Sequence, residues 1–169
     1  MPDAPELFLI DGNSLAYRAF FALPESIGTS DGRPTNAIFG LASMLVKIID
    51  EHHPRGVIVA WDAGWSGREK TYDLYKAQRK PRPDLLREQW PHLMPLVEAF
   101  GYTNVKVEGF EADDVIASLA KQARAEGIEV MVVTGDRDAY QLVGDDRLRC
   151  GFELVAGVAA RRDPVGAER

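Results

Sequence analysis

Four short apolar runs that alternate with helix-like segments constrain the fold of this chain more than any other feature of its sequence. The runs are rich in valine, isoleucine and leucine, which favours buried strands, and they lie in residues 7–11, 57–62, 105–113 and 130–138. Strands that alternate with helices are typical of a parallel sheet, because each connection must cross back over the sheet. The sequence therefore predicts an α/β fold of three layers, with a mostly parallel central sheet and helices on both faces.

The segments between the runs show helical periodicity. We expect helices at residues 14–21, 35–52, 84–100 and 113–126. The second of these is the clearest, because its apolar residues recur at intervals of three and four. Asn13 or Ser14 should cap the first helix, and Pro91 and Pro95 should kink or split the third.

Composition narrows the class of protein. The 169 residues suffice for one domain with a sizeable core, and 46% hydrophobic and 27% charged residues are ordinary for a globular protein. No stretch approaches the roughly 20 apolar residues of a membrane span, and the single cysteine, Cys150, permits no internal disulfide. We therefore expect a cytoplasmic protein without membrane contact. We also expect a monomer, although composition does not determine the oligomeric state. The net charge of −6 argues against a uniformly basic surface for nucleic acid, though not against a local one.

Acidic residues stand at or just past the end of every apolar run. The six are Asp11, Asp62, Glu111, Asp113, Asp136 and Asp138. The carboxyl ends of parallel strands meet at one edge of a sheet, where ligands bind in folds of this class. Carboxylates gathered there would repel one another unless cations neutralised them, and oxygen ligands select hard ions such as Mg²⁺ or Mn²⁺. The pattern predicts a metal-dependent phosphoryl-transfer or hydrolysis site.

Each acidic segment also has an ordinary structural explanation. Acidic residues in a first helical turn, such as Glu111, Asp113 and Asp114, can simply cap free N–H groups. An aspartate beside a glycine is common in turns. Four strand ends that all finish in carboxylate are harder to explain in this way.

A basic segment interrupts the acidic chain. Residues 68–87 hold seven basic and three acidic side chains, together with Tyr72 and Tyr75. This segment could be a solvated helical face, or a strip that binds a phosphate backbone while its tyrosines stack on bases. Lys76 and Arg79 are three residues apart and would lie on one side of a helical turn.

Several motifs together resemble one known family. They are LIDGNSLAYR at residues 9–18, PTNAIFG at 34–40, FEADDVIA at 110–117, TGDRD at 134–138 and YQL at 140–142. These stretches look like the 5′→3′ exonuclease domain of bacterial DNA polymerase I, which is part of the flap endonuclease group with a PIN-like fold. The resemblance covers about residues 6–146, in order and at matching spacing.

The resemblance implies a role for each matching position. Five residues fall on the positions that hold the first metal ion, directly or through water: Asp11, Asp62, Glu111, Asp113 and Asp136. Asp138 falls on a position that serves the second ion, and Asp114 on a further acidic position. Contacts to phosphate and DNA are implied for Tyr17, Arg18, Tyr75, Lys76 and Arg79. The residues implied in catalysis are Lys76, Asp113 and Asp136. The cofactor would be Mg²⁺ or Mn²⁺, and the partner would be DNA with 5′ ends, flaps or nicks.

The chain departs from the family after Asp146. The family continues into a Gly-Asp-x-Ser-Asp-Asn segment, which supplies two more second-site aspartates, and then into a helix–hairpin–helix element that grips duplex DNA. Residues 147–169 match neither part. We therefore expect an incomplete nuclease domain over residues 1–146 with an incomplete second metal site, and a divergent, poorly ordered tail over 147–169. A frameshift or premature end near codon 147 would account for this.

The leading interpretation is a divalent-metal-dependent 5′→3′ exonuclease or flap endonuclease that hydrolyses DNA in replication and repair. A small PIN-type ribonuclease is an alternative, since it needs one carboxylate cluster and no helix–hairpin–helix. An inactive fragment that binds metal and DNA is another. A dehalogenase-type phosphatase fits less well, because its second aspartate is replaced here by Asn13.

Overall fold

A five-stranded parallel sheet forms the centre of the molecule. The structure is a computed structural model, and it describes residues 6–63, 81–135 and 148–151. The strands are β1 (Leu7–Asp11), β2 (Gly56–Trp61), β3 (Thr103–Lys106), β4 (Val130–Val133) and β5 (Leu148–Gly151). Their order is β3-β2-β1-β4-β5, and each neighbouring pair is parallel. This confirms the predicted parallel α/β architecture.

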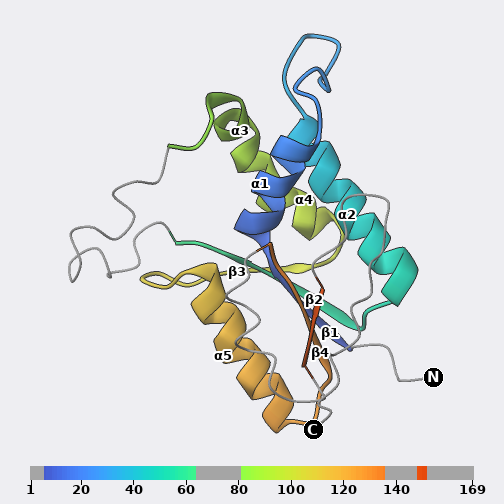
Figure 1. Ribbon diagram of the computed structural model, residues 1–169, viewed down its shortest axis with the longest axis vertical. Helices are drawn as coiled ribbons and strands as arrows, with labels where there is room; N and C mark the ends of the chain where they lie inside the picture. The colour runs from blue at the N-terminus through green and yellow to red at the C-terminus, as the bar shows by residue number, and fades with distance from the viewer. Residues whose placement is uncertain (1–5, 64–80, 136–147, 152–169) are drawn as a thin grey trace, which may run out of the picture.

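Helices cover both faces of the sheet (Figure 1). Their bounds are α1 (Gly12–Ala22), α2 (Asn36–His52), α3 (Asp84–Gln89), the 3-10 helix η2 (Trp90–His92), α4 (Leu93–Ala99) and α5 (Ala112–Ala125). Among the helices that the structure describes, α1, α2 and α4 lie on one face of the sheet and α5 lies on the other. Within the described ranges, no helix is both long enough and apolar enough to cross a bilayer.

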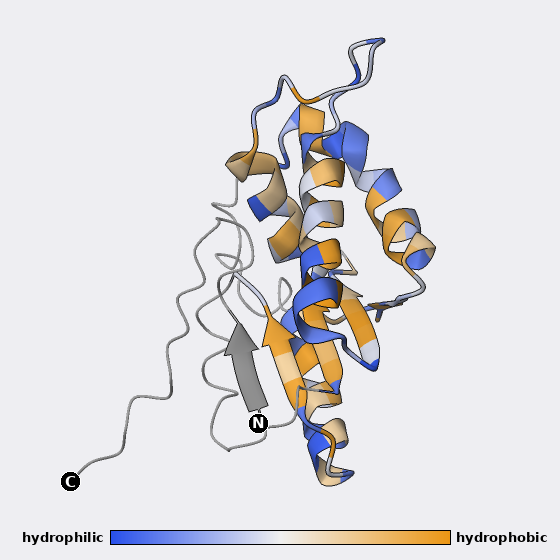
Figure 2. Cartoon of the chain, turned by 90° about the vertical axis from the view of Figure 1, so that its right-hand side faces the viewer, coloured by the Kyte–Doolittle hydropathy of each residue, from blue (hydrophilic) through white to orange (hydrophobic). Residues whose placement is uncertain are grey.

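Strands β1, β2 and β4 are apolar on both sides because both faces are covered. Phe8 and Ile10 of β1 point into the core beneath α1 and α2, whereas Leu9 between them packs in the core beneath α5. Figure 2 accordingly shows the central strands as almost continuously hydrophobic, whereas the helices alternate between hydrophobic and hydrophilic residues. Continuous apolar runs are what a doubly covered parallel sheet requires.

The first and third helices differ in detail from the sequence-based expectation. Helix α1 begins at Gly12, two residues earlier than predicted, and its N-cap is Asp11 instead of Asn13 or Ser14. The third helix is split at η2, which contains Pro91, as expected. Pro95 does not break the chain, because it lies in the first turn of α4, where a missing N–H costs nothing.

Strand β5 lies within the stretch 147–169, for which the sequence predicted a poorly ordered tail. Its backbone pairs in parallel with β4, with Leu148 opposite Val130 and Gly151 opposite Val133. A four-residue segment is too short to show an alternating pattern, so only its pairing reveals it as a strand. Residues 152–169 lie outside the described part of the chain.

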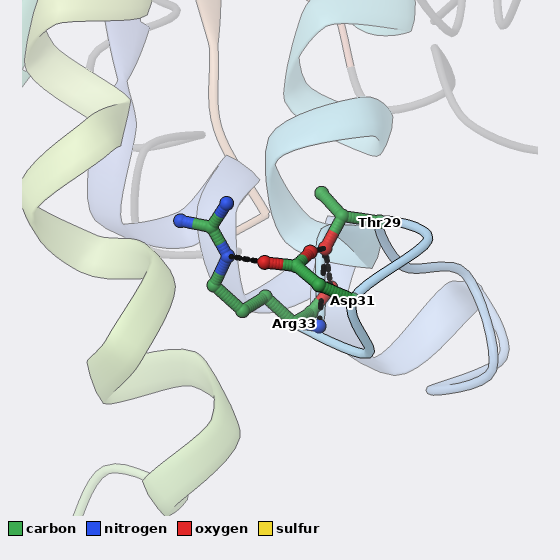
Figure 3. Close-up of polar contacts among 3 residues, drawn as sticks. All are labelled: Thr29, Asp31 and Arg33. Atoms are coloured by element: carbon green, nitrogen blue, oxygen red, sulfur yellow. Dashed lines mark hydrogen bonds and ion pairs between the residues drawn. The ribbon is translucent and has the colours of Figure 1, made fainter.

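The loop between α1 and α2 is held by its own polar contacts (Figure 3). The hydroxyl group of Thr29 donates a hydrogen bond to Asp31, and Arg33 Nε contacts the same carboxylate at 3.0 Å. The Thr29 hydrogen bond, more than any other contact, lowers the pKa of Asp31. Behind the loop, a cavity of about 210 Å³ is lined by Thr29, Arg33, Pro34, Thr35, Ile38, Glu88, Gln89 and His92.

The chain changes direction across the sheet between β1 and β4. From β1 it moves outward through β2 to β3, and α5 then carries it back to the opposite side of β1, where β4 pairs. In open α/β sheets, ligands bind beyond the carboxyl ends of the strands at such a switch point. The carboxyl end of β1 is Asp11, and β4 leads into residues 134–138.

Candidate metal centre

Asp11 lies at the centre of the carboxyl edge and is almost fully buried. Only 6% of its surface is exposed. One carboxylate oxygen accepts a hydrogen bond from the Ser14 backbone N–H at 2.9 Å, which caps α1. The other accepts one from the hydroxyl group of Thr134, just past β4, at 3.0 Å. Asp11 therefore joins the ends of the two strands that flank the switch point.

Burial disfavours the ionised form of the Asp11 carboxyl group. Loss of water raises its pKa to about 6, although the hydrogen bond from the Ser14 N–H opposes the shift. The negative charges of Asp113 and Asp62 raise this pKa further. Three carboxylates from β1, the end of β2 and the start of α5 thus share one electrostatic environment. Such an arrangement favours a cation or a proton.

Asp62 follows directly after β2 and is held from two sides. Its Oδ2 accepts a hydrogen bond from Asn13 Nδ2 at 2.8 Å, and its Oδ1 accepts one from the Ala112 backbone N–H at 2.9 Å. The backbone N–H of Asp62 donates in turn to Asn13 Oδ1 at 3.2 Å. Asp62 thereby joins the end of β2 to the first residues of both α1 and α5.

The first turn of α5 divides its acidic residues between two roles. Glu111 is the N-cap, and its side chain accepts from the backbone of Asp114, whose side chain accepts from the Glu111 N–H in return. This capping box is the ordinary structural explanation of those two carboxylates. Asp113 takes no part in the box, is exposed, and acts electrostatically on Asp11.

The end of β4 comes close to the start of α1. The Gly135 backbone N–H donates to Ser14 Oγ at 2.7 Å. A Cβ atom at position 135 would collide with that hydroxyl oxygen, so the contact requires glycine. This bond fixes the chain immediately before Asp136, which with Asp138 lies outside the described residues.

A close approach of Gly12 to Trp61 brings α1 against β2. A Cβ atom on Gly12 would lie 2.7 Å from ring carbons of Trp61. Each of these residues precedes or follows a site carboxylate by one position, since Gly12 follows Asp11 and Trp61 precedes Asp62. The absence of a side chain at position 12 therefore lets the two strand ends draw together.

The carboxylates within the described part of the chain do not suffice for a metal site by themselves. Among residues 6–63, 81–135 and 148–151, no three histidine, cysteine or acidic groups form a cluster that could hold a metal ion. The donors nevertheless suit a divalent ion: all are oxygens, one is buried, and their charges repel. A complete shell would need ligands from water or from residues beyond β4.

The predicted DNA-contacting residues are only partly described. Tyr17 and Arg18 lie half-buried on α1, and the Tyr17 ring packs edge-on against Trp90 at 6.0 Å. From the basic segment, the Arg82 guanidinium carbon lies 3.4 Å from the centre of the Trp90 ring. Tyr75, Lys76 and Arg79 fall outside the described residues, so their implied contacts stay predictions.

Three polar residues of the site were not predicted for these roles. Asn13, Ser14 and Thr134 each hydrogen-bond to a carboxylate or to the backbone of another strand end. Sequence reasoning assigned the first two to capping α1. A sequence signal did exist, because neutral donors directly after a strand-end aspartate can reach its neighbours across the edge.

Comparison with known proteins shows the family of this chain. Residues 6–160 match the model of the 5′-3′ exonuclease, N-terminal resolvase-like domain. The chain belongs to this family. DNA polymerase I of Caldicellulosiruptor bescii is 45% identical over 139 residues, or 82% of this chain and 16% of that protein. The thermostable DNA polymerase I of Thermus thermophilus is 46% identical over 140 residues, which are 82% and 17% of the two chains.

The chain spans about one-sixth of the length of these curated relatives. Solved structures share its fold at lower identity. A bacteriophage T5 5′-exonuclease with bound zinc ions is 20% identical, with a TM-score of 0.59, over 86% of this chain and 54% of that one. A T5 flap endonuclease in a pseudo-enzyme–product complex with DNA and metal ions is 21% identical, with a TM-score of 0.58 and the same coverage. These likenesses confirm the predicted PIN-like, 5′ nuclease fold.

Proposed function

We propose that this domain is a divalent-metal-dependent 5′ nuclease that hydrolyses phosphodiester bonds in DNA. One observation carries the proposal: a buried aspartate, Asp11, lies at the switch point of the sheet, and Asp62 and Asp113 raise its pKa together with burial. Membership of the 5′-3′ exonuclease family supports the proposal. So does the polymerase I relatives' sequence identity across most of the chain.

In this proposal, Asp11, Asp62 and Asp113 hold the first ion together with Asp136. Glu111 would contact that ion directly or through water, Asp138 would serve a second ion, and Asp114 would be a further acidic group at the site. A divalent ion held there, either Mg²⁺ or Mn²⁺, would lower the pKa of a water molecule and neutralise charge on the phosphate. The protein's own side chains would position the site and stabilise charge on the phosphate. Ser14 and Thr134 fix the strand ends, and Lys76 and Arg79 stabilise negative charge on the phosphate.

The proposed substrate is DNA with a 5′ end, flap or nick. The T5 relative with the same fold is described in complex with DNA and metal ions. Tyr17 and Arg18 on α1, with Tyr75 in the basic segment, would contact the DNA strand. A role in replication and repair, a cytoplasmic location and a monomeric state belong to the same proposal.

Cleavage of a 5′-flap DNA tests the proposal. Purified protein with Mn²⁺ or Mg²⁺ should release the labelled flap, and EDTA should abolish the release. Loss of a residue that merely supports a metal ligand costs about 10–100-fold in affinity or activity, so Asp113→Asn should cost at least that much. Asp50→Asn is the matched control. It removes one exposed carboxylate near the end of α2, which leads into the amino end of β2, so the rate should be unchanged.

Three outcomes would contradict the proposal. If cleavage continues in EDTA, the reaction does not require a divalent ion. If Asp113→Asn cleaves the flap as fast as wild type does, the Asp113 carboxylate does not take part in the site. Faster cleavage of single-stranded RNA than of flap DNA would favour a PIN-type ribonuclease instead.

A further inference from the structure

The side chain of Asn13 forms two hydrogen bonds with Asp62. Its amide nitrogen donates to the Asp62 carboxylate at 2.8 Å, and its amide oxygen accepts from the Asp62 backbone N–H at 3.2 Å. Asn13 lies in the first turn of α1, two residues after Asp11, whereas Asp62 is 49 positions away in sequence. A single side chain therefore fixes both the backbone and the side chain at the end of β2.

These two hydrogen bonds oppose the charge repulsion between Asp62 and Asp11, which would otherwise turn the Asp62 side chain away from Asp11. Asp62 is half-buried. Its negative charge repels that of Asp11 and so raises the pKa of Asp11. A carboxylate free to rotate would move towards water and away from its neighbour. With Asn13 on Oδ2 and the Ala112 N–H on Oδ1, both oxygens are anchored. Each oxygen still keeps a further lone pair with which it can accept.

The chemistry of asparagine suits this task better than a charged donor would. A lysine or arginine at position 13 would neutralise Asp62 and compete with a cation for it. The amide donates a hydrogen bond without adding charge, so the carboxylate keeps its full attraction for a divalent ion. The acceptor oxygen of the same amide pairs with the backbone, which a hydroxyl group could not do while also donating at that distance.

We propose that Asn13 is a positioning residue, which holds the Asp62 carboxylate beside Asp11 in the geometry that divalent-ion binding requires. The inference rests on the proposed function, because it assumes that Asp62 binds the ion. Asn13 acts through Asp62 and touches neither the ion nor the substrate. Its removal should therefore weaken ion binding more than it weakens the fold.

Calorimetric titration of the metal-free protein with Mn²⁺ tests this role. Asn13→Ala should raise the dissociation constant for Mn²⁺ about 10–100-fold. Asn104→Ala is the matched control. Asn104 is also half-buried and also uses both ends of its amide, as it accepts from Trp61 Nε1 at 2.7 Å and donates to the Met94 carbonyl at 2.9 Å. It contacts none of the proposed ligands, so its loss should change Mn²⁺ affinity less than twofold.

A double-mutant cycle shows whether Asn13 acts through Asp62. In an Asp62→Ala background, Asn13→Ala should have no further effect on Mn²⁺ affinity. Asn13→Ser keeps a hydroxyl group that can form one of the two bonds. It should bind Mn²⁺ with an affinity between those of wild type and Asn13→Ala, and it replaces the alanine variant if that variant fails to fold.

The outcomes separate the two proposals. If wild type binds Mn²⁺ and the Asn13 variants bind it equally well, the positioning role is wrong and the proposed function stands. Equal losses in Asn13→Ala and Asn104→Ala, or additive effects in the cycle, would also overturn the role, because they indicate general destabilisation. If wild type itself does not bind Mn²⁺, the proposed function fails and the positioning role fails with it.

Discussion

At the scale of single residues, burial of Asp11 disfavours the charged form of its carboxyl group. Its carboxyl group is buried and its pKa is raised to about 6, whereas the same group in an unfolded chain ionises near 3.8. The folded protein therefore holds a proton on Asp11 over a pH range in which the unfolded chain has lost it. Folding is favoured most below about pH 4, and this contribution is lost as the pH rises through 6.

This shift predicts the pH dependence of stability in the absence of metal. Between pH 4 and pH 7, Asp11 alone should remove roughly 2 kcal/mol from the free energy of unfolding. The Asp11→Asn variant lacks this titration, and its amide oxygen can still accept from the Ser14 N–H. Urea denaturation in EDTA should show that the variant loses correspondingly less stability than wild type over this range. Parallel pH profiles for the two proteins would contradict the assignment, and Asp50→Asn, remote from the site, should follow wild type.

Residue-scale sequence reasoning predicted the acidic residues of the candidate site but not the polar side chains that hydrogen-bond to them. Asp11 and Asp62 were predictable because each ends or follows a strand, and strand ends converge in a parallel sheet. Asp113 was predicted at the end of the apolar run 105–113, but β3 ends at Lys106 and Asp113 lies in the first turn of α5. Asn13 was recognisable as a polar residue just after a strand-end aspartate, but its pairing with Asp62 was not predictable, because the pairing depends on how α1 crosses β2. Glu111 and Asp114 were ambiguous between ligation and capping, and the structure places both in a capping box.

At the scale of secondary-structure elements, a buried polar clamp joins three helices on one face of the sheet. Gln89 of α3 is 1% exposed, and its side-chain oxygen accepts from the backbone N–H groups of Ala37 and Ile38 at the start of α2. Its amide nitrogen donates to Asn36, which in turn donates to the Phe20 carbonyl oxygen in α1. Gln89 thus supplies the N-terminal cap that the Thr35 side chain does not provide.

Removal of this clamp should destabilise the fold without affecting the metal site. Gln89→Ala would leave buried N–H groups of α2 and the Asn36 side chain without partners, at a cost of about 2–4 kcal/mol. The control Gln122→Ala removes an exposed glutamine that bonds only locally, to Ser118 in α5, and should cost less than about 0.5 kcal/mol. Urea denaturation measures both. Equal stability of the two variants would show that the clamp contributes little.

Element boundaries were predictable only where the local signal was strong. The bounds of α2 and α5 agree with their apolar periodicity to within one residue. The start of α1 was misplaced, because the aspartate that ends β1 is itself the cap. Strand β5 has too few residues for any periodic signal, and its existence depends on pairing with β4.

At the scale of the whole molecule, the alternation of strands and helices determined the architecture correctly. The three layers and the parallel sheet follow from that alternation, because a crossover helix must return along each face. The order of the strands does not follow from it. The return of the chain past β1 to β4 is what brings Asp11 beside Thr134 and creates the switch point. We propose that the carboxylates gathered there bind a divalent ion, which offsets their mutual repulsion.

The melting temperature with and without Mn²⁺ tests this claim most directly. An ion that binds only the folded state, at a hundredfold excess over its dissociation constant, stabilises the fold by about 2.7 kcal/mol. For a domain of this size, that should raise the melting temperature by roughly 5–10 °C. Asp113→Asn should melt no lower than wild type in EDTA, because it removes a repulsive charge, and should respond less to Mn²⁺. If Mn²⁺ leaves the melting temperature of wild type unchanged and Asp113→Asn is destabilised in EDTA, the acidic residues serve only as caps and turns, and the account is wrong.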